Sequence, residues 1–320
     1  MTVPATRSSL PGATLIDPQA LMGIRNLELR ARVVVEGFWS GLHRSPYHGF
    51  SVEFTEYRQY SVGDDPRYVD WRVFARSDRY FIKRFEDETN LRCHLLADLS
   101  RSMAFGSVGF TKAEYAATLA ATLAYFLHLQ GDAVGLLTFD GGLRDYLPPR
   151  HRAGHLRNLM LALEKPASGA ATDLAAPLRR VAEIVRRRGL VMMISDFLAP
   201  LEQLEPGLVA IAAGGHEVVV FQVLDPAEAT LGFQRPAMFE DLETGRVLFI
   251  DPASSREEYL RRFAAHNDAL LALCQRLGIT CHRVISDQPL ELALFEFLRQ
   301  RVQADRGNRR VARHQGRRGA

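Results

Sequence analysis

An aspartate and two serines stand at alternate positions just after a short apolar run. The stretch HLLADLSRSMAFG covers residues 94–106, and Asp98, Ser100 and Ser102 form a D-x-S-x-S pattern within it. The alternate spacing lets the three side chains converge from one tight loop. Carboxylate and hydroxyl oxygens suit hard cations such as Mg²⁺ or Mn²⁺ rather than Zn²⁺. The pattern therefore indicates a candidate metal site, with helix capping by either serine as the alternative.

Two residues elsewhere in the chain could complete such a site from separate loops. Thr172 opens the stretch TDLAAPL, a predicted helix, and Asp196 ends the apolar run MMISD. With one or two carboxylates the site holds little negative charge, so we expect it to bind Mg²⁺ or Mn²⁺ weakly. Water and a carboxylate from a partner protein are expected to supply the remaining ligands.

Four predicted strands end in aspartate, at Asp98, Asp140, Asp196 and Asp225. In an open parallel sheet the ligand crevice lies beyond the carboxyl ends of the strands. The sequence therefore places several carboxylates on one rim of the sheet. Asp140 precedes two glycines and Asp225 precedes a proline, so we expect these two to open a turn or cap a helix.

Strand and helix patterns alternate from residue 91 onward, which is typical of an α/β domain. Near-continuous apolar strands indicate a parallel sheet covered on both faces, and right-handed crossovers give a doubly wound Rossmann-like fold over residues 91–303. The proline-bearing strand at 143–149 is expected at an edge, and residues 237–251 are expected to form a hairpin. Strands are also expected at 91–98, 132–140, 189–197, 216–225 and 279–287, and helices at 111–130, 151–166, 172–188, within 204–215, 254–278 and 289–302.

The other segments form a smaller N-terminal extension and a tail. Residues 1–16 are expected to be disordered. Residues 17–90 comprise a helix, expected at 17–43, and an aromatic and charged segment that should pack on the α/β domain. Residues 304–320 form a basic tail that we expect to be disordered.

The bulk composition is that of a soluble globular protein. The 320 residues are 47% hydrophobic and 24% charged. No apolar run approaches the roughly 18–20 residues of a membrane span, and the N-terminal stretch lacks the apolar core of a signal peptide. Three cysteines are few and odd in number, so we expect reduced thiols and a cytoplasmic protein.

Charge is unevenly placed along the chain. Residues 306–320 hold six Arg and no acidic residue, whereas the rest carries 34 basic and 37 acidic residues. We therefore expect no sequence-specific nucleic-acid binding by the body of the protein. For the tail, a solubilising role and a contact with RNA, DNA or an acidic partner are the alternatives. Lysine occurs only at positions 83, 112 and 165, which we attribute to compositional bias.

Motifs of several enzyme classes are absent from the sequence. It has no G-x-x-x-x-G-K-[ST] loop for nucleotide phosphates, no H-E-x-x-H zinc pair and no G-x-S-x-G nucleophile elbow. No general base accompanies the D-x-S-x-S cluster at a suitable position. We therefore predict no catalytic residues and a non-enzymatic protein.

A longer pattern precedes the metal-site candidate. Residues 60–76 read Y-x-x-G-D-D-x-R-x-x-D-W-x-x-x-A-R, and a strand, the D-x-S-x-S pattern and Met103 follow. This run resembles the signature of a bacterial family of unknown function, number fifty-eight in the usual domain series. That family carries a von Willebrand factor A-like domain and is associated with MoxR-type AAA+ ATPases.

The resemblance implies a six-stranded Rossmann-like sheet flanked by helices and a metal-ion-dependent adhesion site (MIDAS). In that site Asp98, Ser100, Ser102 and Thr172 would hold Mg²⁺ directly, and Asp196 would bind it directly or through water. Two features depart from the family. Some relatives begin with membrane helices, which this chain lacks, and Gly169 stands three residues before Thr172, farther than the usual glycine.

The favoured interpretation is a non-enzymatic, metal-dependent adaptor for protein–protein interaction. It would present its metal to an acidic residue of a MoxR-type AAA+ ATPase or of that ATPase's client, in the assembly or activation of client complexes. A Mg²⁺- or Mn²⁺-dependent hydrolase and a metal-free scaffold are the alternatives.

Overall fold

The computed structural model describes residues 15–44, 56–59, 81–84, 91–167, 175–242 and 245–301. Nearly all of the segment 1–16, most of 44–90, Thr172 and the whole of 304–320 lie outside these ranges. The expectations of disorder in the first and last segments, and of packing by the aromatic segment, therefore stay predictions.

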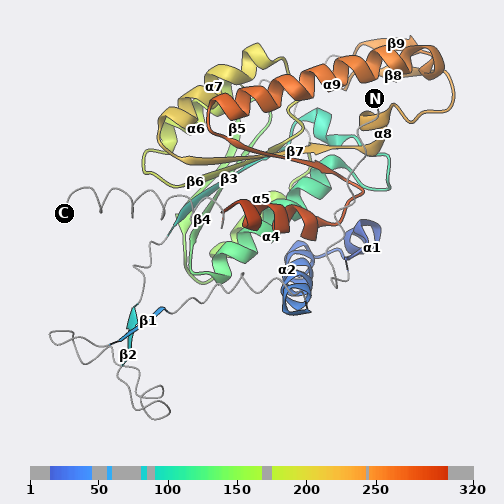
Figure 1. The fold of residues 1–320 in the computed structure, drawn as a ribbon. Coiled ribbons are helices and arrows are strands. Elements are labelled where there is room, and N and C mark those ends of the chain that lie inside the picture. Colours follow the sequence, from blue (N-terminus) through green and yellow to red (C-terminus); the bar gives the residue numbers. More distant parts are fainter. Residues whose placement is uncertain are drawn as a thin grey trace.

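A six-stranded sheet forms the centre of the molecule (Figure 1). Its strand order is β10-β7-β6-β3-β4-β5, and every neighbouring pair is parallel except β4 and the edge strand β5. This is the doubly wound order, in which the first strand along the chain lies in the middle of the sheet. The predicted Rossmann-like fold is confirmed. The strands are β3 Arg92–Asp98, β4 Ala133–Phe139, β5 Leu143–Arg150, β6 Leu190–Ser195, β7 Glu217–Leu224 and β10 Thr280–Ile285.

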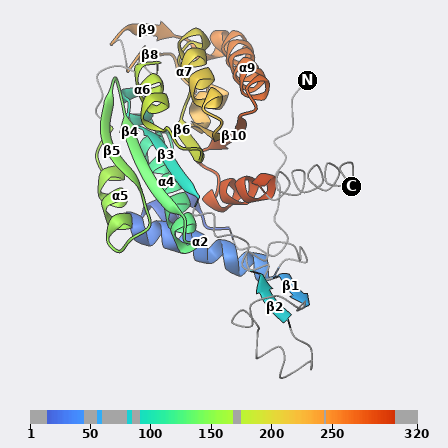
Figure 2. The same cartoon turned by 90° about the vertical axis from the view of Figure 1, so that its left-hand side faces the viewer.

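Helices cover both faces of this sheet (Figure 2). One face is covered by α1 Pro18–Met22, α2 Leu27–Arg44, α4 Lys112–Leu129, α5 His155–Leu163 and a helix at 290–301. The other is covered by α6 Ala175–Ile184, α7 Leu201–Ala213 and α9 Pro252–Arg276.

The central strands are mostly apolar because each of their faces is buried. In β3, Leu95 packs in the core beneath α4, whereas its neighbour Leu96 packs with Leu178 of α6 and Leu208 of α7. Successive strand residues point to opposite faces, so a strand between two helical layers needs an unbroken apolar run. Asp98 and Ser195 stand at the carboxyl ends of β3 and β6, where the crevice lies.

The N-terminal helix predicted at 17–43 is wrong as a single element, since α1 and α2 are separate. Gly23 forms the C-terminal cap of α1. The Oδ1 atom of Asn26 then accepts a hydrogen bond of 2.7 Å from the Leu29 amide in the first turn of α2. An asparagine that satisfies a free amide favours a new helix start, and the chain therefore turns between the two helices.

Helix α7 is longer than the short helix predicted within 204–215, because it begins at Leu201 and contains Pro206. A proline inside a helix removes one backbone hydrogen bond. Burial of Leu204, Leu208 and Ile211 along the same helix offsets that loss.

Short elements complete the described part of the chain. The predicted hairpin at 237–251 is confirmed, with strands β8 Ala237–Glu240 and β9 Val247–Ile250, and α8 Pro226–Thr230 precedes it. A second antiparallel pair joins β1 Glu56–Gln59 to β2 Phe81–Arg84. None of the helices in the described ranges is long and apolar enough to cross a membrane.

Candidate metal centre

The candidate site lies where the chain order of the sheet reverses. Strands β3 and β6 are neighbours in the sheet but are separated by β4 and β5 in sequence. A doubly wound sheet opens a crevice at this switch point, beyond the carboxyl ends of the two strands. Asp98 is the last residue of β3, and Ser195 and Asp196 end and follow β6. The fold thus brings two predicted metal ligands to one place.

The Asp98 carboxylate is buried, with 1% of the residue exposed. Its Oδ1 accepts a hydrogen bond of 2.8 Å from the Ser100 amide, and its Oδ2 accepts one of 2.5 Å from the Ser195 hydroxyl. Burial and the nearby Asp196 charge raise the pKa of Asp98 well above its ordinary value, and the two hydrogen bonds only partly oppose this. A nearby cation would favour the charged form.

Ser100 and Ser102 converge as the alternate spacing predicts. Their hydroxyl oxygens lie 3.1 Å apart, and Ser100 is fully buried. Ser100 occupies the N-cap position of the 3₁₀-helix Arg101–Ala104, but its side chain makes no capping hydrogen bond. The capping alternative is therefore wrong for Ser100, and its hydroxyl contacts that of Ser102 instead.

Asp196 is held by a lysine that the sequence analysis did not assign to the site. The Lys112 ammonium, fully buried in the first turn of α4, lies 2.9 Å from Asp196 Oδ2 and 2.7 Å from Glu228 Oε1. The other Asp196 oxygen accepts a hydrogen bond of 3.3 Å from the Leu198 amide. Burial acts to lower the pKa of Lys112, but the two carboxylates outweigh it and raise that pKa. The ammonium is therefore charged.

A signal for Lys112 was present in the sequence. It is one of three lysines in 320 residues and begins an Ala-rich, apolar helix. Compositional bias accounts for the scarcity of lysine but not for this position, where the ammonium is buried with two carboxylates.

The two aspartates expected to cap helices or open turns do so. Asp225 is the N-cap of α8, and the Asp140 carboxylate accepts a hydrogen bond from the Gly142 amide. Asp225 also accepts hydrogen bonds of 2.8 and 2.5 Å from the amide and hydroxyl of Ser107. This unexpected contact fixes the chain that follows the D-x-S-x-S loop against α8.

The described side chains could bind a hard divalent cation only if serine hydroxyls act as ligands together with the Asp98 carboxylate. Asp98, Ser100 and Ser102 supply oxygen donors from one loop, which suits Mg²⁺ or Mn²⁺. In the described ranges no group of three His, Cys, Asp or Glu side chains could hold a metal. Thr172 lies outside those ranges, in the segment before α6.

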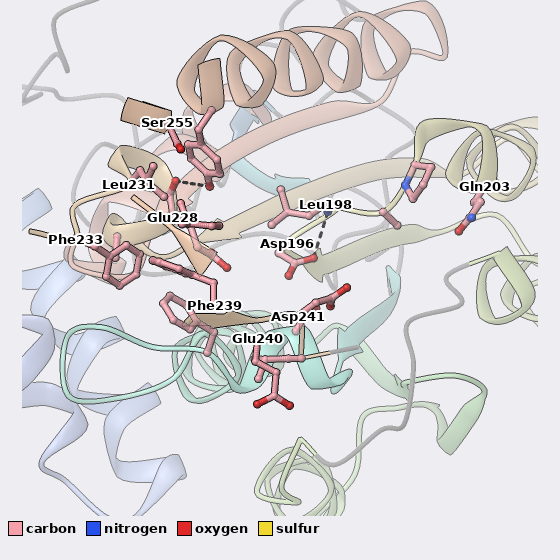
Figure 3. Close-up of a pocket in the computed structure, with 18 residues that line it drawn as sticks. Asp196, Leu198, Gln203, Glu228, Leu231, Phe233, Phe239, Glu240, Asp241 and Ser255 are labelled. Carbon is pink, nitrogen blue, oxygen red and sulfur yellow. Dashed lines mark hydrogen bonds between the residues drawn. The ribbon is translucent and has the colours of Figure 1, made fainter. Parts of the chain in front are cut away.

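A pocket of about 640 Å³ opens beside the crevice, and Ser102 and Asp196 belong to both (Figure 3). Its walls come from the loop after β6, from α8, from the start of α9 and from the β8–β9 hairpin. The side chains that line it are mostly apolar, aromatic or acidic.

Comparison with known proteins places the chain among uncharacterised relatives. The family model described as "Protein of unknown function DUF58" matches residues 56–269. The chain is 34% identical over 256 residues to the uncharacterized protein Rv1480 of Mycobacterium tuberculosis, covering 78% of this chain and 80% of that protein. It is 30% identical over 154 residues to the uncharacterized protein MAV169 of Mycobacterium avium, covering 48% and 89%.

Solved structures similar to this chain include a conserved hypothetical protein and a domain of known class. The first is BatB from Bacteroides thetaiotaomicron, at 17% identity and a TM-score of 0.44, covering 66% of this chain and 98% of that one. The second is the SpRpn10 VWA domain, at 12% identity and a TM-score of 0.37, covering 63% and 92%.

Proposed function

This chain belongs to the DUF58 family of proteins of unknown function, and we propose that it is a cytoplasmic, non-enzymatic adaptor that presents a bound Mg²⁺ or Mn²⁺ to a partner protein. The proposed partner is a MoxR-type AAA+ ATPase or its client, because the signature at residues 60–103 resembles a family associated with such ATPases. An acidic side chain of the partner would complete the coordination of the metal.

The buried Asp98 carboxylate is the observation that carries this proposal. Both of its hydrogen bonds come from neutral donors, and no basic side chain in the described ranges forms a salt bridge with it. An isolated buried carboxylate is costly unless it is paired or coordinates a metal. Asp98, Ser100 and Ser102 would hold the cation directly, and Thr172 is proposed as a fourth ligand from the sequence pattern.

Asp196 would act through water in this arrangement. Its Oδ2 is paired with Lys112 and its Oδ1 accepts a hydrogen bond from Leu198, so neither oxygen is free of a protein contact. Direct ligation by a single carboxylate would leave the cation with residual positive charge. That charge would attract an Asp or Glu of the partner.

Titration calorimetry against the candidate ATPase tests the proposal. We expect binding in millimolar Mg²⁺ that weakens at least tenfold with a chelator, and that fails with Asp98→Ala or with Ser100→Ala and Ser102→Ala together. Asp268→Ala, which removes an exposed carboxylate of α9, is the control and should bind normally. Equal affinity with and without chelator would contradict a metal-dependent contact.

A metal-free scaffold is the second candidate, and the Lys112 ion pairs favour it. One ammonium already offsets part of the charge of Asp196 and Glu228. Under this alternative, Mg²⁺ and Mn²⁺ would leave the melting temperature of the wild-type chain unchanged.

A further inference from the structure

The backbone takes an unusual conformation directly after Asp196. Phe197 has a φ of 52°, in the left-handed region that bulky side chains rarely adopt, and its side chain is buried in the core with residues of α6 and α7. A residue in such a conformation persists only where its surroundings fix it, and such residues cluster at functional sites. The contacts that hold Phe197 therefore bear on the candidate metal centre beside it.

The Phe197 backbone is linked to the Asp98 carboxylate through one hydroxyl group. The Phe197 amide donates a hydrogen bond of 3.3 Å to Ser195 Oγ, and the Ser195 hydroxyl donates one of 2.5 Å to Asp98 Oδ2. All three residues are buried, with at most 2% exposed. A rotation of the Phe197 peptide would withdraw the donor from Ser195 and leave its hydroxyl free to turn away from Asp98.

A histidine of α9 holds this part of the backbone in place. His266 Nε2 donates a hydrogen bond of 2.8 Å to the Phe197 carbonyl oxygen. A carbonyl oxygen only accepts, so Nε2 carries the proton in this contact. The two residues are 69 positions apart in sequence, and their bond therefore fixes the loop after β6 to α9.

A buried side-chain amide holds the preceding carbonyl in the same way. Gln222 Nε2 donates a hydrogen bond of 3.2 Å to the Asp196 carbonyl oxygen and one of 2.8 Å to Asn267 Oδ1. Its Oε1 accepts a hydrogen bond of 3.2 Å from Arg283. Strand β7 is apolar after Glu217 except for Gln222, which is 1% exposed. A buried amide is costly unless it is hydrogen-bonded, so these contacts are needed at this position.

We propose that His266 and Gln222 are positioning residues of the candidate metal centre. They hold two successive carbonyl groups of the loop after β6, and that loop keeps the Ser195 hydroxyl on the Asp98 carboxylate. The proposal rests on the proposed function, because Asp98 is the carboxylate that would bind the metal. It gives α9 and β7 a part in the site that the D-x-S-x-S pattern does not contain.

Hydrogen exchange of single amides, measured by NMR in EDTA, tests the positioning without the metal. His266→Ala should speed the exchange of the Phe197 and Ser100 amides about fivefold, because one hydrogen bond that holds the loop is lost. His266→Gln should restore slow exchange, since its side-chain amide can donate to the same carbonyl. Gln222→Met keeps the length of the side chain but not its donor, and it should act like His266→Ala.

His216→Ala is the matched control. His216 also contacts a backbone carbonyl through Nε2, that of Val185 at 3.0 Å, and it is half-buried like His266. It stands just before the amino end of β7, away from the crevice. Its loss should leave the two crevice amides unchanged. Equal exchange of these amides in His266→Ala and in the wild type would overturn the proposal, as would equal acceleration by His216→Ala.

Binding of Mn²⁺, followed by the EPR signal of the free ion, tests the consequence for the metal. The wild type and His216→Ala should bind Mn²⁺ equally, His266→Ala about fivefold more weakly, and His266→Gln nearly as well as the wild type. An unchanged Mn²⁺ affinity in His266→Ala would overturn the proposal. A wild-type chain that binds no Mn²⁺ would instead overturn the adaptor function, whereas the exchange experiment still decides whether His266 positions Asp98.

Discussion

The crevice has two parts that differ in electrostatic environment, one around Asp98 and one around Lys112. Asp98 is bonded to neutral donors, whereas Asp196 and Glu228 share the Lys112 ammonium. In the proposed function a divalent cation would bind beside Asp98, and it would be repelled near Lys112. Placing the metal on the D-x-S-x-S loop satisfies both conditions, and each condition leads to a prediction.

Asp98→Asn should abolish the response of the protein to divalent cations. We expect Mg²⁺ or Mn²⁺ at about ten times its Kd to raise the wild-type melting temperature by about 2–5 °C, which follows from about 1.4 kcal/mol of linkage. The variant keeps the shape of the side chain but loses its charge, so its melting temperature should not change with the metal. Differential scanning fluorimetry checks this, with Asp268→Asn as the control that retains the response. A wild-type protein without any response would contradict the metal site.

Lys112→Met should destabilise the protein because it leaves Asp196 and Glu228 without their counter-charge. Removing one partner of a buried ion pair costs about 3–5 kcal/mol. Lys165→Met is the matched control, since the Lys165 side chain is 46% exposed in its ion pair with Asp145, and such pairs contribute about 0–1 kcal/mol. Urea unfolding measures both variants. Millimolar Mg²⁺ should stabilise Lys112→Met more than the wild type, because Asp196 becomes available to the metal. Similar losses in the two lysine variants would contradict the role assigned to Lys112.

Among the elements, the contact between α6 and α7 depends on one glycine. A Cβ at Gly207 of α7 would overlap the Leu178 side chain of α6. Gly207→Ala should therefore push the helices apart and cost about 1–3 kcal/mol. Gly142→Ala is the control, because a Cβ there has nothing within 4 Å, and it should change stability by less than about 0.5 kcal/mol. Urea denaturation compares the two, and a neutral Gly207→Ala would contradict the close approach.

The strands and most helices can be predicted from the local sequence pattern. The contacts between polar side chains at the candidate site cannot. The apolar run that ends at Asp98 predicts β3, and Thr111 and Gly131 bracket α4, because a capping box and a residue with φ of 86° stand at its two ends. The pairing of Lys112 with Asp196 joins residues 84 positions apart. That contact depends on how α4 lies against the end of β6, which no local spacing encodes. The same holds for Ser107 and Asp225.

On the scale of the whole molecule, the candidate binding features lie together at one end of the strands. The metal-site candidate, the pocket beside it and the β8–β9 hairpin all lie beyond the carboxyl ends of the parallel strands. The hairpin exposes large apolar side chains, namely Met238, Val247, Leu248 and Phe249.

Removing residues 306–320 should leave the fold intact. Six arginines with few apolar residues offer little surface to bury. At 0.5 M salt, where contacts between exposed charges are screened, the truncated and full-length chains should melt within about 1 °C of each other. Calorimetry measures both melting temperatures. A large loss of stability at high salt would show instead that the segment packs as part of the core.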